Sequence, residues 1–185
     1  YVVLYDRSSG SESVLPSSLY GLSPQINAEG HVVWYNEYEY KDIHLSDGSK
    51  TVELTSSTTY LDKSPQINPN GDVVWYGYDY AGSEIFLYES SSEITTQLTD
   101  NDYLDTKPQI NESGDVVWRG NDGTDYEIYY YDRSSGVTTQ LTDDDYDDGY
   151  PQINANGEVV WDGYDGNDYE IFLYDGSNTI QLTDN

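Results

Sequence analysis

Closely spaced carboxylates are the feature of this sequence best suited to chemistry. They are densest in the run Asp-Asp-Asp-Tyr-Asp-Asp-Gly at residues 143–149. Ca²⁺ binds carboxylate oxygens, and a bound cation would offset the repulsion between neighbouring charges. We therefore predict a calcium site with the candidate ligands Asp143, Asp145, Asp147 and Asp148. The alternative is a solvated acidic loop, because the glycine of this run comes one place late for a calcium loop and Asn154 stands at its twelfth position.

A repeated unit must position this run. The tetrapeptide Pro-Gln-Ile-Asn occurs four times, at spacings of 41, 43 and 43 residues, and a tryptophan follows each proline by ten residues. The prolines are Pro24, Pro65, Pro108 and Pro151, and the tryptophans are Trp34, Trp75, Trp118 and Trp161. A period of about 40–45 residues is typical of β-propeller blades.

The third unit divides into four predicted strands, at residues 108–111, 115–118, 127–132 and 137–142. Valine, isoleucine, threonine and aromatic residues dominate these segments, and Gly, Asn, Asp and Ser separate them, which is the pattern of short strands joined by turns. No stretch of the chain has a helical period. Each proline is expected at the first residue of its strand, where a missing N–H does least harm.

We therefore predict an all-β fold, a β-propeller of four-stranded antiparallel blades with strands a to d from the centre outward. The single domain covers residues 1–185, with an N-terminal half blade at 1–21 and repeats at 22–63, 64–107, 108–150 and 151–185. The fold is five-bladed if the half blade is completed. The four tryptophans are expected to be buried between blades. The glutamine of each Pro-Gln-Ile-Asn motif is expected to form a ring of amides near the centre.

The repeated unit resembles the TolB-type propeller repeat, a WD40-like blade found in bacterial and archaeal extracellular and surface proteins. The motifs that carry the resemblance are Pro-Gln-Ile-Asn-x-x-Gly-x-Val-Val-Trp, Glu-Ile-Phe-Leu-Tyr-Asp and Thr-Gln-Leu-Thr-Asp, and it covers essentially the whole chain. The turns at 68–71 and 154–157 read Asn-Pro-Asn-Gly and Asn-Ala-Asn-Gly where the family favours Ser-Pro-Asp-Gly. The family includes periplasmic scaffolds, surface proteins and propeller domains of peptidases, so the resemblance implies the fold and leaves the function open.

Composition excludes several classes of partner. Thirty-five acidic residues against seven Lys plus Arg give a formal net charge of −28, which repels nucleic acid and anionic membrane surfaces. No apolar run is long enough for membrane insertion. The absence of cysteine and methionine suits an extracellular or cell-surface location, because neither thiol nor thioether is present to be oxidised.

Enzymatic chemistry finds little support in the sequence. The two histidines, His31 and His44, occupy positions where the other repeats carry an acid or phenylalanine, and no nucleophile is paired with either. With so many acidic residues, a pair of carboxylates carries no information about glycoside hydrolysis. We expect no catalytic residues and no cofactor apart from Ca²⁺.

Two functions remain open. In the first, the chain is a structural or adhesive surface module that assembles with copies of itself into a filament or array, because an uncompleted half blade leaves a strand edge open for pairing. In the second, it is a glycan-binding module whose loops use calcium, since tyrosine faces stack on sugar rings while carboxylates and amides accept hydroxyl groups. Tyrosine in these loops has the alternative role of packing between neighbouring blades.

Overall fold

The computed structural model describes residues 1–16, 20–37, 41–56, 61–78 and 81–184. Throughout these residues the regular structure is β-strand. Four four-stranded antiparallel sheets follow a two-stranded hairpin, which confirms the predicted all-β propeller fold. The described residues contain no helix of the length and apolar character that a bilayer span requires.

The hairpin pairs β1 (Val3–Asp6) with β2 (Ser11–Val14). Blade 1 contains β3 (Gly21–Ile26), β4 (Val32–Asn36), β5 (Ile43–Ser46) and β6 (Thr51–Glu53). Blade 2 contains β7 (Leu61–Ile67), β8 (Val73–Tyr78), β9 (Ser83–Glu89) and β10 (Ile94–Gln97). Blade 3 contains β11 (Asp105–Ile110), β12 (Val116–Asn121), β13 (Tyr126–Asp132) and β14 (Val137–Gln140). Blade 4 contains β15 (Gly149–Ile153), β16 (Val159–Tyr164), β17 (Tyr169–Tyr174) and β18 (Thr179–Gln181).

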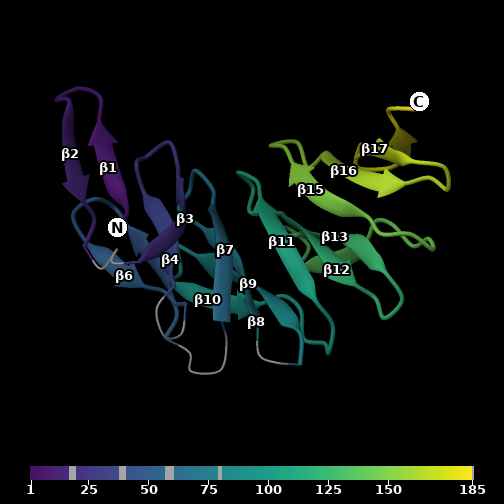
Figure 1. Cartoon of the computed structure of the whole chain (residues 1–185), viewed down its shortest axis with the longest axis horizontal. Helices are drawn as coiled ribbons and strands as arrows, with labels where there is room; N and C mark the ends of the chain where they lie inside the picture. The colour runs from purple at the N-terminus through teal and green to yellow at the C-terminus, as the bar shows by residue number, and fades with distance from the viewer. Residues whose placement is uncertain (17–19, 38–40, 57–60, 79–80, 185) are drawn as a thin grey trace.

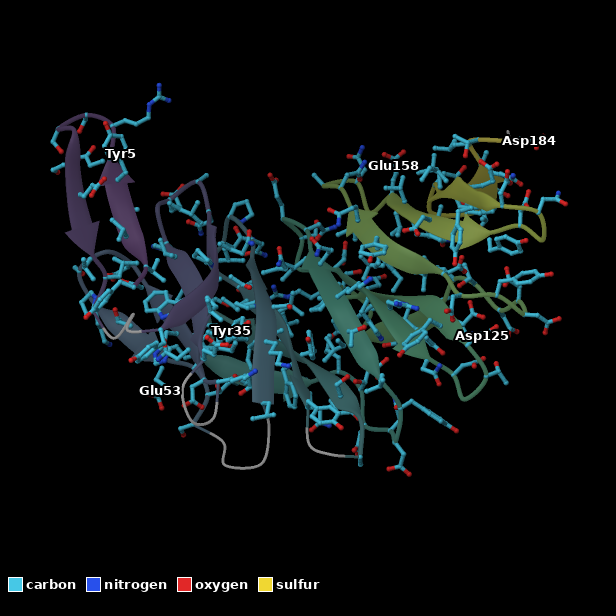
Figure 2. The ribbon with its side chains drawn as sticks, in the orientation of Figure 1. Tyr5, Tyr35, Glu53, Asp125, Glu158 and Asp184 are labelled. Carbon is cyan, nitrogen blue, oxygen red and sulfur yellow. The ribbon has the colours of Figure 1, made fainter. Side chains whose placement is uncertain are left out.

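The blades stand side by side along an arc, with the hairpin at one end and blade 4 at the other (Figure 1). The first strands of successive blades, β3, β7, β11 and β15, contact one another and form the inner side of the arc. The fourth strands lie on the outside, where β10, β14 and β18 are exposed along their whole length. Figure 2 places the labelled Tyr5 and Asp184 near opposite ends of the arc.

The position of the prolines was predicted wrongly. Pro108 is the fourth residue of β11, and the register of β11 against β12 shifts between Thr106 and Gln109. Lys107, the residue before it, has φ of 54°, and Ser64 before Pro65 has φ of 51°. Each proline thus lies at a bulge, where the strand has already lost a ladder hydrogen bond, so a residue without an N–H is tolerated inside the strand.

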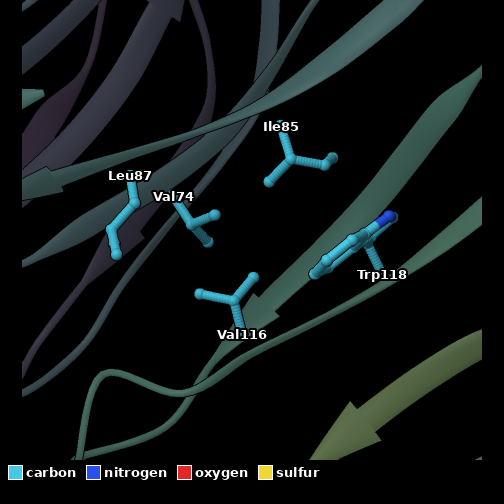
Figure 3. Close-up of a cluster of buried hydrophobic side chains, with 5 residues drawn as sticks. All are labelled: Val74, Ile85, Leu87, Val116 and Trp118. Atoms are coloured by element: carbon cyan, nitrogen blue, oxygen red, sulfur yellow. The ribbon is translucent and has the colours of Figure 1, made fainter. Parts of the chain in front are cut away.

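Apolar side chains pack between successive blades. We call the side of a blade that meets the next blade its forward face and the opposite side its backward face. Between blades 2 and 3, Val74, Ile85 and Leu87 of the forward face contact Val116 and Trp118 of the backward face (Figure 3). The same arrangement recurs at the other interfaces, which we call joints. The tryptophans are at most 2% exposed, as predicted: Trp34, Trp75, Trp118 and Trp161.

Asparagine, rather than glutamine, links the blades through the Pro-Gln-Ile-Asn motif. The side-chain Nδ2 of Asn68 donates to the backbone carbonyl of Asn111 at 3.1 Å, and Nδ2 of Asn111 donates to that of Asn154 at 3.2 Å. Asn27 donates to Asn68 in the same way at 3.0 Å. The side chain of Gln152 instead donates to the backbone carbonyl of its neighbour Pro151, at 2.9 Å. In place of the predicted ring of glutamine amides, the structure has a ladder of asparagines, each directly after the first strand of its blade.

Candidate functional site

The acidic run at 143–149 is divided in the structure. One carboxylate oxygen each of Asp122, Glu127 and Asp143 lies within 4.8 Å of the others, which is close enough to share one cation. Asp147 instead accepts a hydrogen bond from the backbone N–H of Tyr126 at 3.1 Å and lies 3.7 Å from the guanidinium of Arg119. Of the four predicted calcium ligands, only Asp143 belongs to this group among the described residues.

Asp148, another of the predicted ligands, is buried in the joint between blades 3 and 4. Burial raises the pKa of Asp148 to about 6. Glu127 is also fully buried there, and burial raises its pKa to about 7. Its Oε1 accepts the backbone N–H of Asp144 at 3.1 Å, and its Oε2 forms a hydrogen bond with the hydroxyl of Thr142.

A tryptophan and an aspartate form a hydrogen bond in the joint between blades 1 and 2 and again in the joint between blades 2 and 3. The indole Nε1 of Trp75 donates to Oδ1 of Asp62 at 3.1 Å, and that of Trp118 donates to Oδ1 of Asp105 at 3.0 Å. Both carboxyls are about 2% exposed. Burial raises the pKa of Asp62 to about 6 despite the donated hydrogen bonds.

A glycine creates the space for each of these aspartates. Gly120 lies opposite Asp105 in the sheet, and a Cβ added to Gly120 would lie 2.3 Å from Oδ1 of Asp105. Blade 1 reverses the arrangement, with Gly21 opposite Asn36. Trp34 of this blade has a buried Nε1 without a hydrogen-bond partner among the described residues.

The pairing of a buried aspartate with a glycine on the neighbouring strand was not predicted from the sequence, although the sequence contains a signal for it. An aspartate stands three residues before three of the prolines, at Asp62, Asp105 and Asp148, and a glycine stands two residues after the matching tryptophan, at Gly77, Gly120 and Gly163. In blade 1 both positions differ, because Gly21 stands at the aspartate position and Asn36 at the glycine position. Glu39 and Asp79, two further acidic residues between predicted strands, lie outside the described residues.

The two ends of the arc expose apolar side chains. At the hairpin end, a hollow of about 360 Å³ is lined by Tyr1, Val3, Leu22 and Ile26, which are 36–73% exposed. We call these four residues the hairpin end face. At the other end, Ile171 and Leu182 are 42% and 52% exposed. These two residues, on the forward face of blade 4, form the blade 4 end face.

Comparison within the chain identifies the cause of this exposure. Ile43, Ile85 and Ile128 occupy the position of Ile171 in blades 1 to 3 and are fully buried, each beneath the backward face of the following blade. Ile171 has the same residue type on the same face, but it is 42% exposed, and no following blade covers it among the described residues. The blade 4 end face therefore presents a surface that every other blade covers.

Three tyrosines form a cluster near the acidic loops. The rings of Tyr146 and Tyr164 are 5.0 Å apart and those of Tyr164 and Tyr169 are 5.6 Å apart, all in edge-to-face contact. Tyr146 and Tyr169 are 42% and 63% exposed. A hollow of about 290 Å³ beside them is lined by Arg119, Asp147, Asp148, Gly149, Tyr150, Asp162 and Tyr169.

The histidines form no visible catalytic arrangement among the described residues. The ring of His44 stacks on Trp34 with centroids 5.6 Å apart, and its Nε2 lies 2.7 Å from Nδ2 of Asn36. Burial lowers the pKa of His44, which favours the neutral ring. Its contacts are therefore those of a packed aromatic side chain.

Comparisons with known proteins address the fold. No family model and no curated protein sequence matches the chain. Among solved structures, TolB from Acinetobacter baumannii is 21% identical with a TM-score of 0.68, covering 98% of this chain and 48% of that one. The propeller domain of the trilobed protease of Pyrococcus furiosus is 16% identical with a TM-score of 0.70, covering 98% and 57%. Dipeptidyl peptidase 4 of Porphyromonas gingivalis is 15% identical with a TM-score of 0.71, covering 99% and 29%.

The chain thus spans about half of the TolB structure that it matches and less than a third of the peptidase. TolB and peptidase propellers occur together among these similar structures, so the likeness distinguishes no activity. At identities of 21% or less it establishes the architecture alone, and this architecture agrees with the repeat motifs and the observed sheets. The chain therefore has the β-propeller fold, with four-stranded antiparallel blades.

Proposed function

We propose that this chain is a non-enzymatic structural or adhesive module that associates end to end with copies of itself at an extracellular or cell-surface location. The observation that carries the proposal is the pair of uncovered apolar surfaces, the hairpin end face and the blade 4 end face. Burial of Ile171 and Leu182 beneath a second copy would remove apolar surface from water, which favours association by about 25 cal/mol per Å².

Two different surfaces meeting head to tail give a contact that repeats. Such a heterologous contact forms a ring if the rotation between copies closes, and a filament if it does not. The large negative charge of the chain opposes this association, and salt screening weakens that repulsion. Association is therefore expected to strengthen as the ionic strength increases.

Substitution of the blade 4 end face tests the proposal. Ile171→Glu is expected to abolish the concentration-dependent increase in mass that light scattering detects for the wild-type chain, because a buried charge without a partner is costly. Ile94→Glu is the matched control, since Ile94 is 56% exposed on the outer strand β10, away from either end face. A wild-type chain that remains monomeric at high concentration, or an equal effect of both variants, would contradict end-to-end association.

A calcium-dependent glycan-binding module is the second candidate. It is favoured by the cluster of Tyr146, Tyr164 and Tyr169, which lies near a hollow whose lining includes Arg119 and Asp162. Aromatic rings provide flat apolar surfaces for sugar rings, and carboxylates accept hydrogen bonds from hydroxyl groups. Glycan binding through this surface would persist in a monomer, whereas end-to-end association would not.

Calcium is expected to raise the melting temperature of the wild-type chain, because a ligand that binds only the folded state stabilises it. Asp143→Asn should abolish the increase, since Asp143 shares the group with Asp122 and Glu127. Asp145→Asn removes the same charge from outside that group and is expected to retain the increase. If millimolar calcium has no effect beyond that of matched ionic strength, the group of Asp122, Glu127 and Asp143 is not a calcium site.

A further inference from the structure

The three joints between consecutive four-stranded blades each contain two carboxyls and one threonine hydroxyl. The first carboxyl precedes the isoleucine of the third strand, and the threonine follows the fourth strand. The second carboxyl lies in, or directly before, the first strand of the next blade. The three sets are Asp42, Thr55 and Asp62, then Glu84, Thr99 and Asp105, then Glu127, Thr142 and Asp148. At the hairpin joint, Tyr1, Pro16 and Gly21 stand at these positions, so the set is present or absent as a unit.

Buried oxygens without partners mark all three sets. Among the described residues, at least one carboxylate oxygen of each set is inaccessible to water and accepts no hydrogen bond. These oxygens are Asp42 Oδ1, Asp62 Oδ2, Glu84 Oε2 and Asp148 Oδ2. A buried charged group without a donor is strongly unfavourable, and a carboxylate can only accept, whereas a protonated carboxyl donates.

The joint between blades 2 and 3 identifies which group would hold a proton. Asp105 receives two N–H donors, from Nε1 of Trp118 at 3.0 Å and from Nδ2 of Asn101 at 2.9 Å. Glu84 receives one N–H donor, the backbone of Asn101 at 3.2 Å, and its Oε2 has no partner among the described residues. Both carboxyls are at most 3% exposed. Burial raises the pKa of both carboxyls, and the larger number of N–H donors favours Asp105 as the ionised one and leaves Glu84 poorly supported as an anion.

Thr99 cannot satisfy both carboxyls. Its Oγ1 accepts the backbone N–H of Ile85 at 2.9 Å, which leaves one hydroxyl proton and one further lone pair. That single proton serves one carboxyl. A proton on Glu84 would complete the set, because Glu84 could then donate to the remaining lone pair of Thr99 while Thr99 donates to Asp105.

We propose that Glu84 is protonated and neutral in the folded protein, so that the joint between blades 2 and 3 takes up a proton as it forms and weakens as the pH rises. This inference does not depend on the proposed function. The remaining titratable groups around the pair reinforce it: Asp100 adds negative charge, and the phenol of Tyr129, whose pKa is raised to about 12 by burial, stays neutral. The ion pairs of the described residues involve neither Glu84 nor Asp105.

The stability of the joint is expected to fall as the pH rises, because the pKa of Glu84 is higher in the folded chain than in the unfolded chain. Burial raises the pKa of Glu84 above its usual value of 4.5. Below pH 4.5 both the folded and the unfolded chain hold the proton, and the joint has its full stability. Above pH 4.5 the unfolded chain releases its proton first, so stability falls with rising pH until folded Glu84 also ionises.

Carboxyl ¹³C NMR of the full chain, recorded in a calcium chelator, tests the proposal directly. The Glu84 resonance, identified by its absence in Glu84→Gln, is expected to titrate above the exposed glutamates. Asp105→Asn should move it back towards the ordinary range, because the amide that this substitution introduces can donate to Thr99 and free the Thr99 proton for Glu84. A Glu84 that titrates with the exposed glutamates would overturn the proposal.

Unfolding measured against pH provides an independent readout. Glu84→Gln imitates the neutral carboxyl, so the folding equilibrium of this variant should lose a dependence of up to about tenfold per pH unit, the change expected for one proton. Glu112→Gln removes the same charge from an exposed turn and should retain the wild-type slope. Equal slopes in the two variants, or a joint that requires calcium and is insensitive to protons, would also overturn the inference.

Discussion

Trp118→Ala is expected to lower the free energy of unfolding by about 3–5 kcal/mol, the range observed when a large buried aromatic side chain is truncated. Trp118 is 1% exposed and stacks on Tyr129 with ring centroids 5.7 Å apart. It also packs on Val74 and Ile85 of the preceding blade (Figure 3). Its loss opens a cavity at a joint and removes a hydrogen-bond donor from Asp105. Urea unfolding followed by circular dichroism measures the change.

Phenylalanine substitutions separate packing from hydrogen bonding at this position. Trp118→Phe removes the indole N–H that Asp105 accepts, whereas Trp34→Phe removes an N–H that has no partner among the described residues. We expect Trp118→Phe to cost about 1–3 kcal/mol more than Trp34→Phe, the penalty for leaving a buried polar group unsatisfied. Equal costs would indicate that the Trp–Asp hydrogen bond contributes nothing to the joint.

Gly120→Ala is expected to destabilise the chain by about 1–3 kcal/mol or more, as overpacking of a close-packed interior does. The new Cβ would lie 2.3 Å from Oδ1 of Asp105 and 2.9 Å from the ring of Tyr129. Neither neighbour can move easily, since Asp105 is held by Trp118 and Asn101, and Tyr129 is stacked on Trp118.

Gly149→Ala is the matched control for the glycine substitution. A Cβ at Gly149 would meet only the carboxylate of Asp162, at 3.7 and 3.8 Å, which is ordinary contact. Its backbone does not require positive φ, so an alanine fits without strain. We expect little loss of stability in this variant by the same urea measurement. A Gly120→Ala chain as stable as Gly149→Ala would contradict the tight packing around Asp105.

The repeat motifs were sufficient to predict the fold because each strand, turn and buried tryptophan recurs with a fixed spacing. The third unit illustrates this, since the strands predicted at 127–132 and 137–142 match β13 (Tyr126–Asp132) and β14 (Val137–Gln140) closely. The first strand was misplaced because the bulge allows Pro108 inside β11, and bulges leave only a weak sequence signal.

The candidate site was less predictable, because it depends on contacts between units. The run at 143–149 was treated as one loop, yet Asp143 lies with Asp122 and Glu127 while Asp148 is buried beside Trp161. The chain bends at residues 144–146, between β14 and β15, so adjacency in sequence does not bring these carboxylates to one point. The sets of two carboxyls and a threonine were invisible for the same reason, since each spans two blades.

Disulfide trapping tests the proposed association between the hairpin end face of one copy and the blade 4 end face of another. The chain has no cysteine, so Val3→Cys on the hairpin end face and Ile171→Cys on the blade 4 end face introduce the only thiols. After oxidation of an equimolar mixture of the two single variants, with one carrying a mass tag, mass spectrometry is expected to find mainly the mixed dimer, and neither variant alone should cross-link efficiently. The absence of cross-linked dimer, or equal amounts of mixed and like dimers, would contradict head-to-tail association.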